Sequence, residues 1–316
     1  MRPAHIARFA VGCALAVSGL SAQQPPAPLS PLVKENATVK ISEHVYLIPN
    51  GNVALVPNIG IIVGRTATLV VDTGLGIRNG QAVLREVAKV SKNANLYVVS
   101  TNFAPEHALG ESAFPPGAKI IRARAQQQDI DEFGLMQADV VRQQSPAIRA
   151  LLQDATFRRG DMYFAREYSL DLGDLRVQIS WLGPTYTRGD TSVFVGGDRV
   201  LFSGDVVLNR TFLPFASPYS SVRTWLSSLD RLDALAPTTV VPSHGATGNG
   251  MLIGQGRGYL EVLQARAAAL KSQGYSVEEA AKTITAEMQT TYPDWAASTR
   301  VADAVTAVFP ELQADR

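Results

Sequence analysis

Two stretches of the sequence consist of short runs of β-branched and aromatic residues, and each run stops at glycine, proline or asparagine. Residues 43–74 contain at least three such runs, and residues 175–207 contain a Gly-Gly-Asp turn between two of them. Runs of this kind predict antiparallel strands joined by tight turns. Two strand-rich blocks, with helical stretches between and after them, predict two packed sheets flanked by helices.

Helical periodicity fills the intervals between and after the strands. Helices are predicted over residues 78–92, 220–235, 258–273 and 277–288, with a last helical stretch after Trp295. Residues from about 120 to 167 are predicted to be helical and polar, with residues 131–153 as the core of the segment. We expect them to form an inserted segment that roofs a cleft and sets its size.

The N-terminal residues are expected to lie outside the globular domain. Arg2 and Arg8 flank the start of an apolar run at residues 9–20, which is too short to span a bilayer. A cleaved secretory signal is the preferred interpretation and a short membrane anchor is the alternative, so we expect a periplasmic or secreted protein. The predicted organisation is a signal peptide at residues 1–22, a flexible linker at 23–34 and one domain at 35–316.

Removal of this signal changes both charge and cysteine content. It takes away two arginines and no acidic residue, which lowers the formal net charge from +1 to about −1. No basic field remains for nucleic acid, so we expect a small-molecule substrate and no stable membrane insertion. The only cysteine, Cys13, is also lost, and any metal site must therefore use His, Asp and Glu. The sequence does not indicate an oligomeric state.

Two of the four histidines occupy positions suited to chemistry. His5 lies in the signal, and His44 lies inside the first predicted strand, where we expect a structural role. His107 and His244 each lie in a loop that follows an apolar strand. Loops at strand ends commonly carry catalytic and metal-binding residues.

Two carboxylates accompany these histidines. Glu106 is the neighbour of His107, and Asp205 ends a third strand in the segment LFSGD. Four candidate ligands from separate strand ends are typical of a site built where strands converge.

Five segments together resemble the metallo-β-lactamase fold superfamily, and they span nearly all of the chain after the signal. The segments are VVDTG at 70–74, TNFAPEH at 101–107, GPTYTRGD at 183–190, LFSGD at 201–205 and VPSHG at 241–245. The resemblance implies an α/β fold, an αββα sandwich with a helical insertion and C-terminal helices. It also implies a metal-dependent hydrolase.

The first metal site of the family is degenerate in this chain. The resemblance places its three histidines at Asn102, Ala104 and Tyr186. Alanine offers no donor, asparagine is a weak neutral ligand, and a tyrosine phenol must lose a proton before it coordinates well. We therefore expect the first site to be absent.

The second metal site retains donors at every position that the resemblance assigns to it. These positions are Glu106, His107, Asp205 and His244. We expect one Zn²⁺ ion there, with iron or manganese as alternatives, because mixed nitrogen and oxygen ligands accept several ions. The structural alternative is that these residues are hydrogen-bonded parts of the fold.

Hydrolysis of a lactam, ester or thioester bond is the activity that such a site implies. One ion can polarise a carbonyl and lower the pKa of its water to about 7. Glu106 or Asp205 would serve as general base, and Tyr186 would either donate a hydrogen bond to an oxyanion or simply fill the pocket. Asp72 is expected to orient the loops beneath the site and Asp190 to order a strand end.

Two other functions stay open at this stage. The chain could be a noncatalytic pseudoenzyme that binds a small ligand in the same cleft, which the changes at Asn102, Ala104 and Tyr186 favour. It could also use Glu106 and His107 as an acid–base pair without metal.

Overall fold

The computed structural model describes residues 31–215 and 217–312. The expected signal peptide and most of the expected linker lie outside these residues. Val33, which we placed in the linker, is buried, and its N–H donates to Asn79 Oδ1 at 2.8 Å. No helix among the described residues is both long and apolar enough to cross a membrane.

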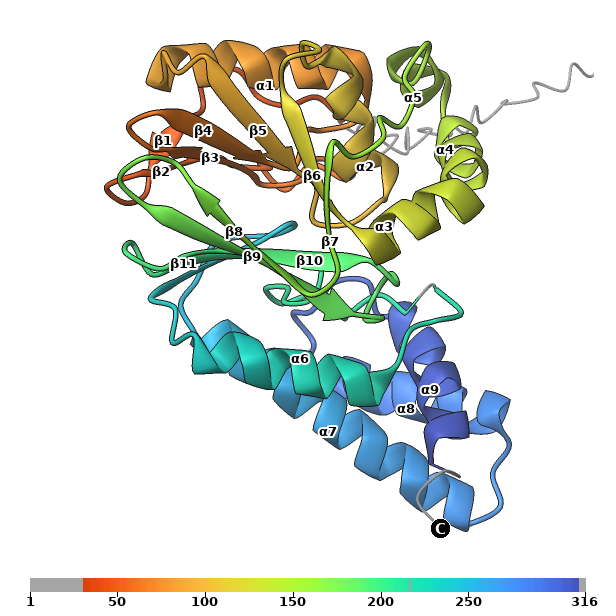
Figure 1. The fold of residues 1–316 in the computed structure, drawn as a ribbon. Coiled ribbons are helices and arrows are strands. Elements are labelled where there is room, and N and C mark those ends of the chain that lie inside the picture. The colour runs from red at the N-terminus through yellow and green to blue at the C-terminus, as the bar shows by residue number, and fades with distance from the viewer. Residues whose placement is uncertain (1–30, 216, 313–316) are drawn as a thin grey trace, which may run out of the picture.

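Two sheets lie face to face between two layers of helices (Figure 1). The first sheet has seven strands in sequence order, antiparallel from β1 to β4 and parallel from β4 to β7. Its strands are β1 (Val39–Lys40), β2 (Val45–Ile48), β3 (Ile59–Val63), β4 (Ala67–Val71), β5 (Asn95–Val99), β6 (Lys119–Ala123) and β7 (Met162–Phe164). The meander predicted for residues 43–74 is confirmed as β2, β3 and β4.

The second sheet has five strands in the order β12, β11, β10, β9, β8. Only the β11–β12 pair is parallel. The strands are β8 (Glu167–Asp171), β9 (Arg176–Gly183), β10 (Asp190–Val195), β11 (Val200–Gly204) and β12 (Thr239–Pro242). The Gly-Gly-Asp turn joins β10 to β11 as predicted.

Helices cover the outer faces of both sheets. Helix α1 (Gly76–Val90) packs on the first sheet, and α6 (Val222–Ala234) and α7 (Met251–Ser272) cover the second, followed by α8 (Val277–Thr291) and α9 (Arg300–Glu311). Helix α7 starts seven residues before the predicted position because its first turns pack apolar residues such as Leu252 and Ile253 into the core. The αββα sandwich is thus confirmed.

The predicted helical segment at residues 120–167 is only partly helical. Its ends are strands β6 and β7, which extend the first sheet in parallel. The helical part consists of α3 (Arg124–Asp129), the π-helical turn η2 (Ile130–Gly134), α4 (Leu135–Arg142) and α5 (Pro146–Leu151). The prediction failed at the ends because strand β6, with the sequence KIIRA, is too short and too close to the polar run after it to show alternation.

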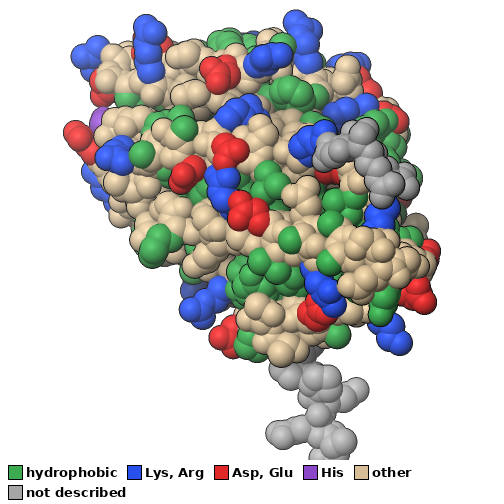
Figure 2. All heavy atoms as spheres, turned by 90° about the horizontal axis from the view of Figure 1, so that it is seen from below, with side chains coloured by type: hydrophobic (Ala, Val, Ile, Leu, Met, Phe, Trp, Pro, Cys, Tyr) green, Lys and Arg blue, Asp and Glu red, His purple; other side chains and the backbone are tan. Residues whose placement is uncertain are grey.

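Four apolar cores lie among the described residues, and one of them joins α4 and α5 to Leu75 and Leu109. Leu69 and Phe202 belong to the core between the sheets, Val83 to the core beneath α1, and Trp225 to the core between the second sheet and the C-terminal helices. Figure 2 shows the molecule from below, and basic and acidic side chains are interspersed on that face without a field of one sign. The loops at one end of the sandwich, where β4, β5, β11 and β12 end, carry the candidate site.

Candidate metal centre

Asp72 organises the loops at the end of the first sheet. It follows β4 and has a positive φ of 62°, a conformation that non-glycine residues rarely adopt. Its Oδ1 accepts a hydrogen bond from the Thr101 N–H at 2.7 Å, and its Oδ2 lies 3.0 Å from Nδ1 of His107. The buried Asp72 carboxylate therefore links the end of β4 to the loop that carries His107.

The backbone of His107 is held as firmly as its ring. Helix α2 (Pro105–Ala108) is a single turn, and the His107 carbonyl accepts hydrogen bonds from the Thr73 N–H at 3.0 Å, the Thr73 hydroxyl at 2.7 Å and the Ser100 hydroxyl at 3.1 Å. So short a helix cannot fix its own orientation, because nucleation is unfavourable. Thr73 and Ser100 supply the missing constraint.

A buried ion pair supports this loop from behind. The Ser100 hydroxyl donates to Glu111 at 2.6 Å, and Arg122 on β6 donates to the other Glu111 oxygen at 2.6 Å. Both charged side chains are fully buried. Burial raises the pKa of Glu111, and the Arg122 guanidinium acts in the opposite direction. No local pattern in the sequence indicates this pair, because Arg122 stands at the edge of a polar run.

The other ring nitrogen of His107 has no hydrogen-bond partner in the part of the chain that the structure describes, although it is fully buried. It lies 3.3 Å from Asp205 Oδ2 without hydrogen-bond geometry. Burial alone would lower the pKa of His107, but Asp72 and Asp205 outweigh it and raise this pKa well above its usual range. A cation is therefore favoured at Nε2, either a proton or a metal ion.

Asp205 lies between the two imidazoles. Its Oδ1 is 3.9 Å from His244 Nε2 and accepts a hydrogen bond from Ser243, while its Oδ2 accepts one from Asn102 at 2.8 Å. Burial alone would raise the pKa of Asp205, but His107, His244 and Ser243 hold it far below its usual range. Asp205 is thus ionised, and each of its carboxylate oxygens accepts a hydrogen bond from another side chain.

Gly204 allows Asp205 to approach the Thr101 loop. Its φ is +59°, and a Cβ at this position would lie 2.9 Å from Cβ of Thr101. Any other residue would therefore push β11 away from the loop that carries His107.

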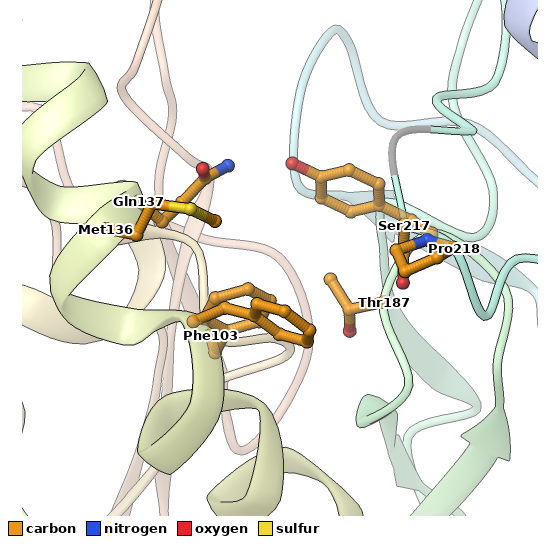
Figure 3. Close-up of a pocket in the computed structure, with 8 residues that line it drawn as sticks. Phe103, Met136, Gln137, Thr187, Ser217 and Pro218 are labelled. Atoms are coloured by element: carbon orange, nitrogen blue, oxygen red, sulfur yellow. The ribbon is translucent and has the colours of Figure 1, made fainter.

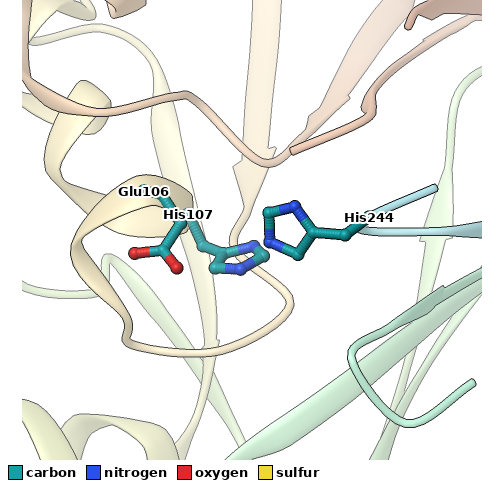
Figure 4. A group of neighbouring side chains, drawn as sticks. All are labelled: Glu106, His107 and His244. Carbon is teal, nitrogen blue, oxygen red and sulfur yellow. The ribbon is translucent and has the colours of Figure 1, made fainter. Parts of the chain in front are cut away.

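Glu106, His107 and His244 converge on one point. One ligand atom from each lies within 4.8 Å of the others, and the two imidazole rings meet edge to face with centroids 5.7 Å apart. Figure 4 shows His244 facing His107 across the gap between the β12 loop and the α2 turn. Three of the four ligands expected from the sequence form this group, and Asp205 lies beside it, 3.3 Å from His107 Nε2 and 3.9 Å from His244 Nε2.

These residues fit a divalent metal ion. The Asp72 carboxylate, as the Nδ1 partner of His107, fixes the tautomer that leaves Nε2 free to coordinate, which is the usual arrangement of a metal-bound histidine. No hydrogen bond to the Glu106 carboxylate is found among the described residues, so its oxygens are free as well. Two imidazoles and two carboxylates form a donor set that zinc, iron and manganese all accept.

The first-site positions have no free donors for a metal. Asn102 uses its amide NH₂ on Asp205 and its Oδ1 to accept the Ala104 N–H at 2.9 Å. Burial, then Glu106 and Asp205, raise the pKa of Tyr186, which keeps its phenol protonated. Asn102 therefore provides a neutral donor to the Asp205 oxygen that a first ion would otherwise approach.

Asp190 orders the loop that carries Tyr186. Its carboxylate accepts hydrogen bonds from the Thr185 hydroxyl and from both the N–H and the hydroxyl of Thr187, each of the latter at 2.8 Å. Burial raises its pKa to about 7, although these hydrogen bonds lower it. Tyr186 lies between the two anchored threonines.

The inserted helices border a cavity next to this loop. It has a volume of about 120 Å³ and is lined by Phe103, Phe133, Met136, Gln137, Tyr186, Thr187, Ser217 and Pro218. Phe103 lies between the first-site positions Asn102 and Ala104, so the cavity and the metal centre share a loop. Sequence reasoning missed Phe103, although its place inside the degenerate motif was a usable signal.

The arrangement defines a class: an αββα sandwich with a histidine–carboxylate centre at its loop end. The model of the metallo-beta-lactamase superfamily matches residues 151–244. The human acyl-coenzyme A thioesterase MBLAC2 is 26% identical over 223 residues, which are 65% of this chain and 76% of that protein. A linear primary-alkylsulfatase from a Pseudomonas species is 24% identical over 208 residues, 56% of this chain and 39% of the relative.

Solved structures show the same fold. The sec-alkylsulfatase Pisa1 from a Pseudomonas species superposes with a TM-score of 0.67 and 13% identity over 87% of this chain, and the chain spans 50% of that protein. A metallo-β-lactamase from Pontibacter korlensis gives a TM-score of 0.54 and 19% identity, covering 71% of this chain and 98% of that one. The chain is thus similar to the metallo-β-lactamase superfamily, in sequence over residues 151–244 and in fold over most of its length. The thioesterase and the alkylsulfatase that it resembles are both hydrolases.

Proposed function

We propose that this chain is an exported hydrolase of small molecules that binds one divalent metal ion, at Glu106, His107, His244 and Asp205. Zinc is the proposed ion, with iron or manganese as alternatives. The proposed target is a lactam, ester or thioester bond, and the thioesterase among the relatives supports the last of these. The composition of residues 1–22 supports export to the periplasm or beyond the cell.

One observation carries this proposal. The Nε2 atom of His107 is fully buried and has no hydrogen-bond partner among the described residues, while ligand atoms of Glu106 and His244 lie within 4.8 Å. An unpaired buried nitrogen is costly in a finished fold, and a metal ion at this point would satisfy it.

An ion held there would polarise a substrate carbonyl and acidify a water molecule. The protein groups around it have separable tasks. Asp205 already accepts hydrogen bonds from Asn102 and Ser243, so it holds charge in place and is a poor proton acceptor. Glu106 is half-buried and has no such partners, so it is the carboxylate better able to act as general base instead of as a tight ligand of the ion.

Tyr186 is the proposed donor to the developing oxyanion. Its side chain lines the cavity, and its hydroxyl makes no hydrogen bond to another described residue. Because burial keeps the phenol protonated, it can donate where the family otherwise places a metal-bound histidine.

A noncatalytic binding protein is the second candidate. The observation that favours it is the closed hydrogen-bonding of Asn102, which fills the first metal site with protein contacts. Such a protein would bind a ligand but would not hydrolyse it, even with a metal ion bound.

Hydrolysis assays on metal-loaded protein distinguish these candidates. The panel contains a β-lactam, an aryl ester, an acyl thioester and an alkyl sulfate, each tested with zinc, iron or manganese. We expect turnover of at least one ester, thioester or lactam, and His244→Ala should reduce it by at least about a hundredfold. His44→Ala is the matched control. His44 forms a hydrogen bond with Asp198 in the turn between β10 and β11, and it takes no part in the site.

Two results would count against the hydrolase. Metal binding without turnover of any substrate would favour the binding protein. Equal activity of the His44→Ala and His244→Ala proteins would place the chemistry elsewhere.

A further inference from the structure

The cavity beside the metal centre has the size of one ring. Its volume is about 120 Å³. A cavity of about 150 Å³ lined by apolar side chains is known to bind benzene. A single phenyl ring or a compact branched group fits such a space, whereas a long alkyl chain would have to leave through the open side.

The walls of the cavity are mainly apolar and come from four separate segments. Figure 3 shows Phe103 on one wall, Met136 and Gln137 of α4 beside it, and Thr187, Ser217 and Pro218 opposite. Phe133 and Tyr186 complete the lining. Aromatic side chains on several sides favour an aromatic ligand, because ring pairs gain energy beyond the burial of their area.

Arg188 holds three of these four segments at a fixed separation. Its guanidinium donates to Asp129 at 3.0 Å and to Glu132 at 2.6 Å, both in the inserted segment. It also lies 4.3 Å from the ring centroid of Tyr219, which follows the Ser217–Pro218 wall. Arg188 itself belongs to the loop of Tyr186 and Thr187, so one side chain connects three of the four walls, all except that of Phe103.

Further hydrogen bonds make this connection rigid. The Gly189 N–H donates to Asp129 Oδ2 at 2.9 Å, and the Tyr219 hydroxyl donates to Glu132 at 3.3 Å. The planar guanidinium provides two directed bonds and a stacking face, a combination that lysine cannot reproduce.

We propose that this cavity is the subsite for an apolar, ring-sized group of the substrate, such as an aryl or compact branched acyl group, and that Arg188 is the positioning residue that sets its size. This inference rests on the proposed function, because the bound group is part of a substrate only if the chain is a hydrolase. Binding of a ring to the cavity does not depend on the metal, because none of the lining residues is one of the four candidate ligands.

Comparison of phenylacetate with acetate tests the subsite. Both carry the same carboxylate, so the ratio of their dissociation constants reports the ring alone. Calorimetric titration with the metal chelated should give at least about tenfold tighter binding of phenylacetate. If metal fails to bind but this ratio holds, the proposed hydrolase falls and the subsite stands.

Matched tryptophan variants locate the ring. Gln137→Trp fills the cavity and should bring the two dissociation constants within about twofold of each other. Gln143→Trp places the same side chain on the exposed end of the same helix and should leave the ratio at its wild-type value. An unchanged ratio in Gln137→Trp, or a ratio near one in the wild type, would overturn the subsite.

Variants of Arg188 test its positioning role. Arg188→Lys and Arg188→Gln should lower the preference for phenylacetate over octanoate by at least about fivefold, since the inserted segment can then move outward. Circular dichroism establishes whether each variant is folded. If the glutamine variant is not folded, the conservative lysine variant provides the test. A preference equal to that of the wild type in the folded variants would show that Arg188 does not set the size.

Discussion

Replacement of Asp190 by asparagine should change how stability depends on pH. Asp190 is buried in the second sheet, and burial raises its pKa from 3.8 to about 7. Asparagine has nearly the same shape, its oxygen can accept from the Thr187 N–H, and its NH₂ can donate to the Thr187 hydroxyl. The substitution therefore removes the ionisation and leaves the loop of Tyr186 in place.

The sign follows from proton linkage. An acid whose pKa is raised on folding binds more protons in the folded state between the two pKa values. The free energy of unfolding of the wild type therefore decreases as pH rises from about 4 to about 7. A difference of roughly three pKa units corresponds to at most about 4 kcal/mol.

Urea unfolding at pH 4, 5.5, 7 and 8 measures this effect. We expect the stability of Asp190→Asn relative to the wild type to increase across this range by up to about 4 kcal/mol. Asp129, whose pKa is raised to about 6 by burial, contributes equally to both proteins and cancels in the difference. Asp233→Asn, the same change at an exposed site on α6, is the control. A difference independent of pH would refute the reasoning.

Three further variants test the metal centre and its support. Asn102→His, Ala104→His and Tyr186→His together should raise the metal content toward two ions per chain, and an unchanged content in folded protein would show that these positions are wrongly assigned. His244→Ala should abolish metal binding while circular dichroism shows an intact fold, because this residue is partly exposed at a loop. Arg122→Met should lower the free energy of unfolding by about 3–5 kcal/mol in urea titration, since it leaves a buried carboxylate unpaired, and a loss below about 1 kcal/mol would contradict that.

Most of the fold could be predicted because its strands follow simple patterns. The meander over residues 43–74 and the Gly-Gly-Asp turn are local features, and each forms as predicted. Strands β6 and β7 could not be predicted, because they exist only through parallel pairing with distant neighbours. Parallel pairing leaves no turn signal in the sequence.

The candidate site divides in the same way. The positions of Glu106, His107, Asp205 and His244 at strand ends could be read from the motifs. The structure groups Glu106, His107 and His244, with Asp205 next to both histidines. The hydrogen bond from Asn102 to Asp205 joins residues 103 positions apart, and no local pattern indicates it.

The contacts of Arg188 were equally hidden. Its motif indicated a strand end. Its partners Asp129 and Glu132 lie in the inserted segment, where acidic residues are expected to be exposed to solvent. Only the folded arrangement shows that they face one loop.

Metal content per chain is the most direct test of the metal centre. The wild type is loaded with zinc, dialysed and measured by elemental analysis, and its melting temperature is recorded before and after chelation. We expect about one ion per chain and a lower melting temperature after chelation, because a ligand of the folded state stabilises it. No bound metal after loading, or two ions per chain, would contradict a single site at Glu106, His107, Asp205 and His244.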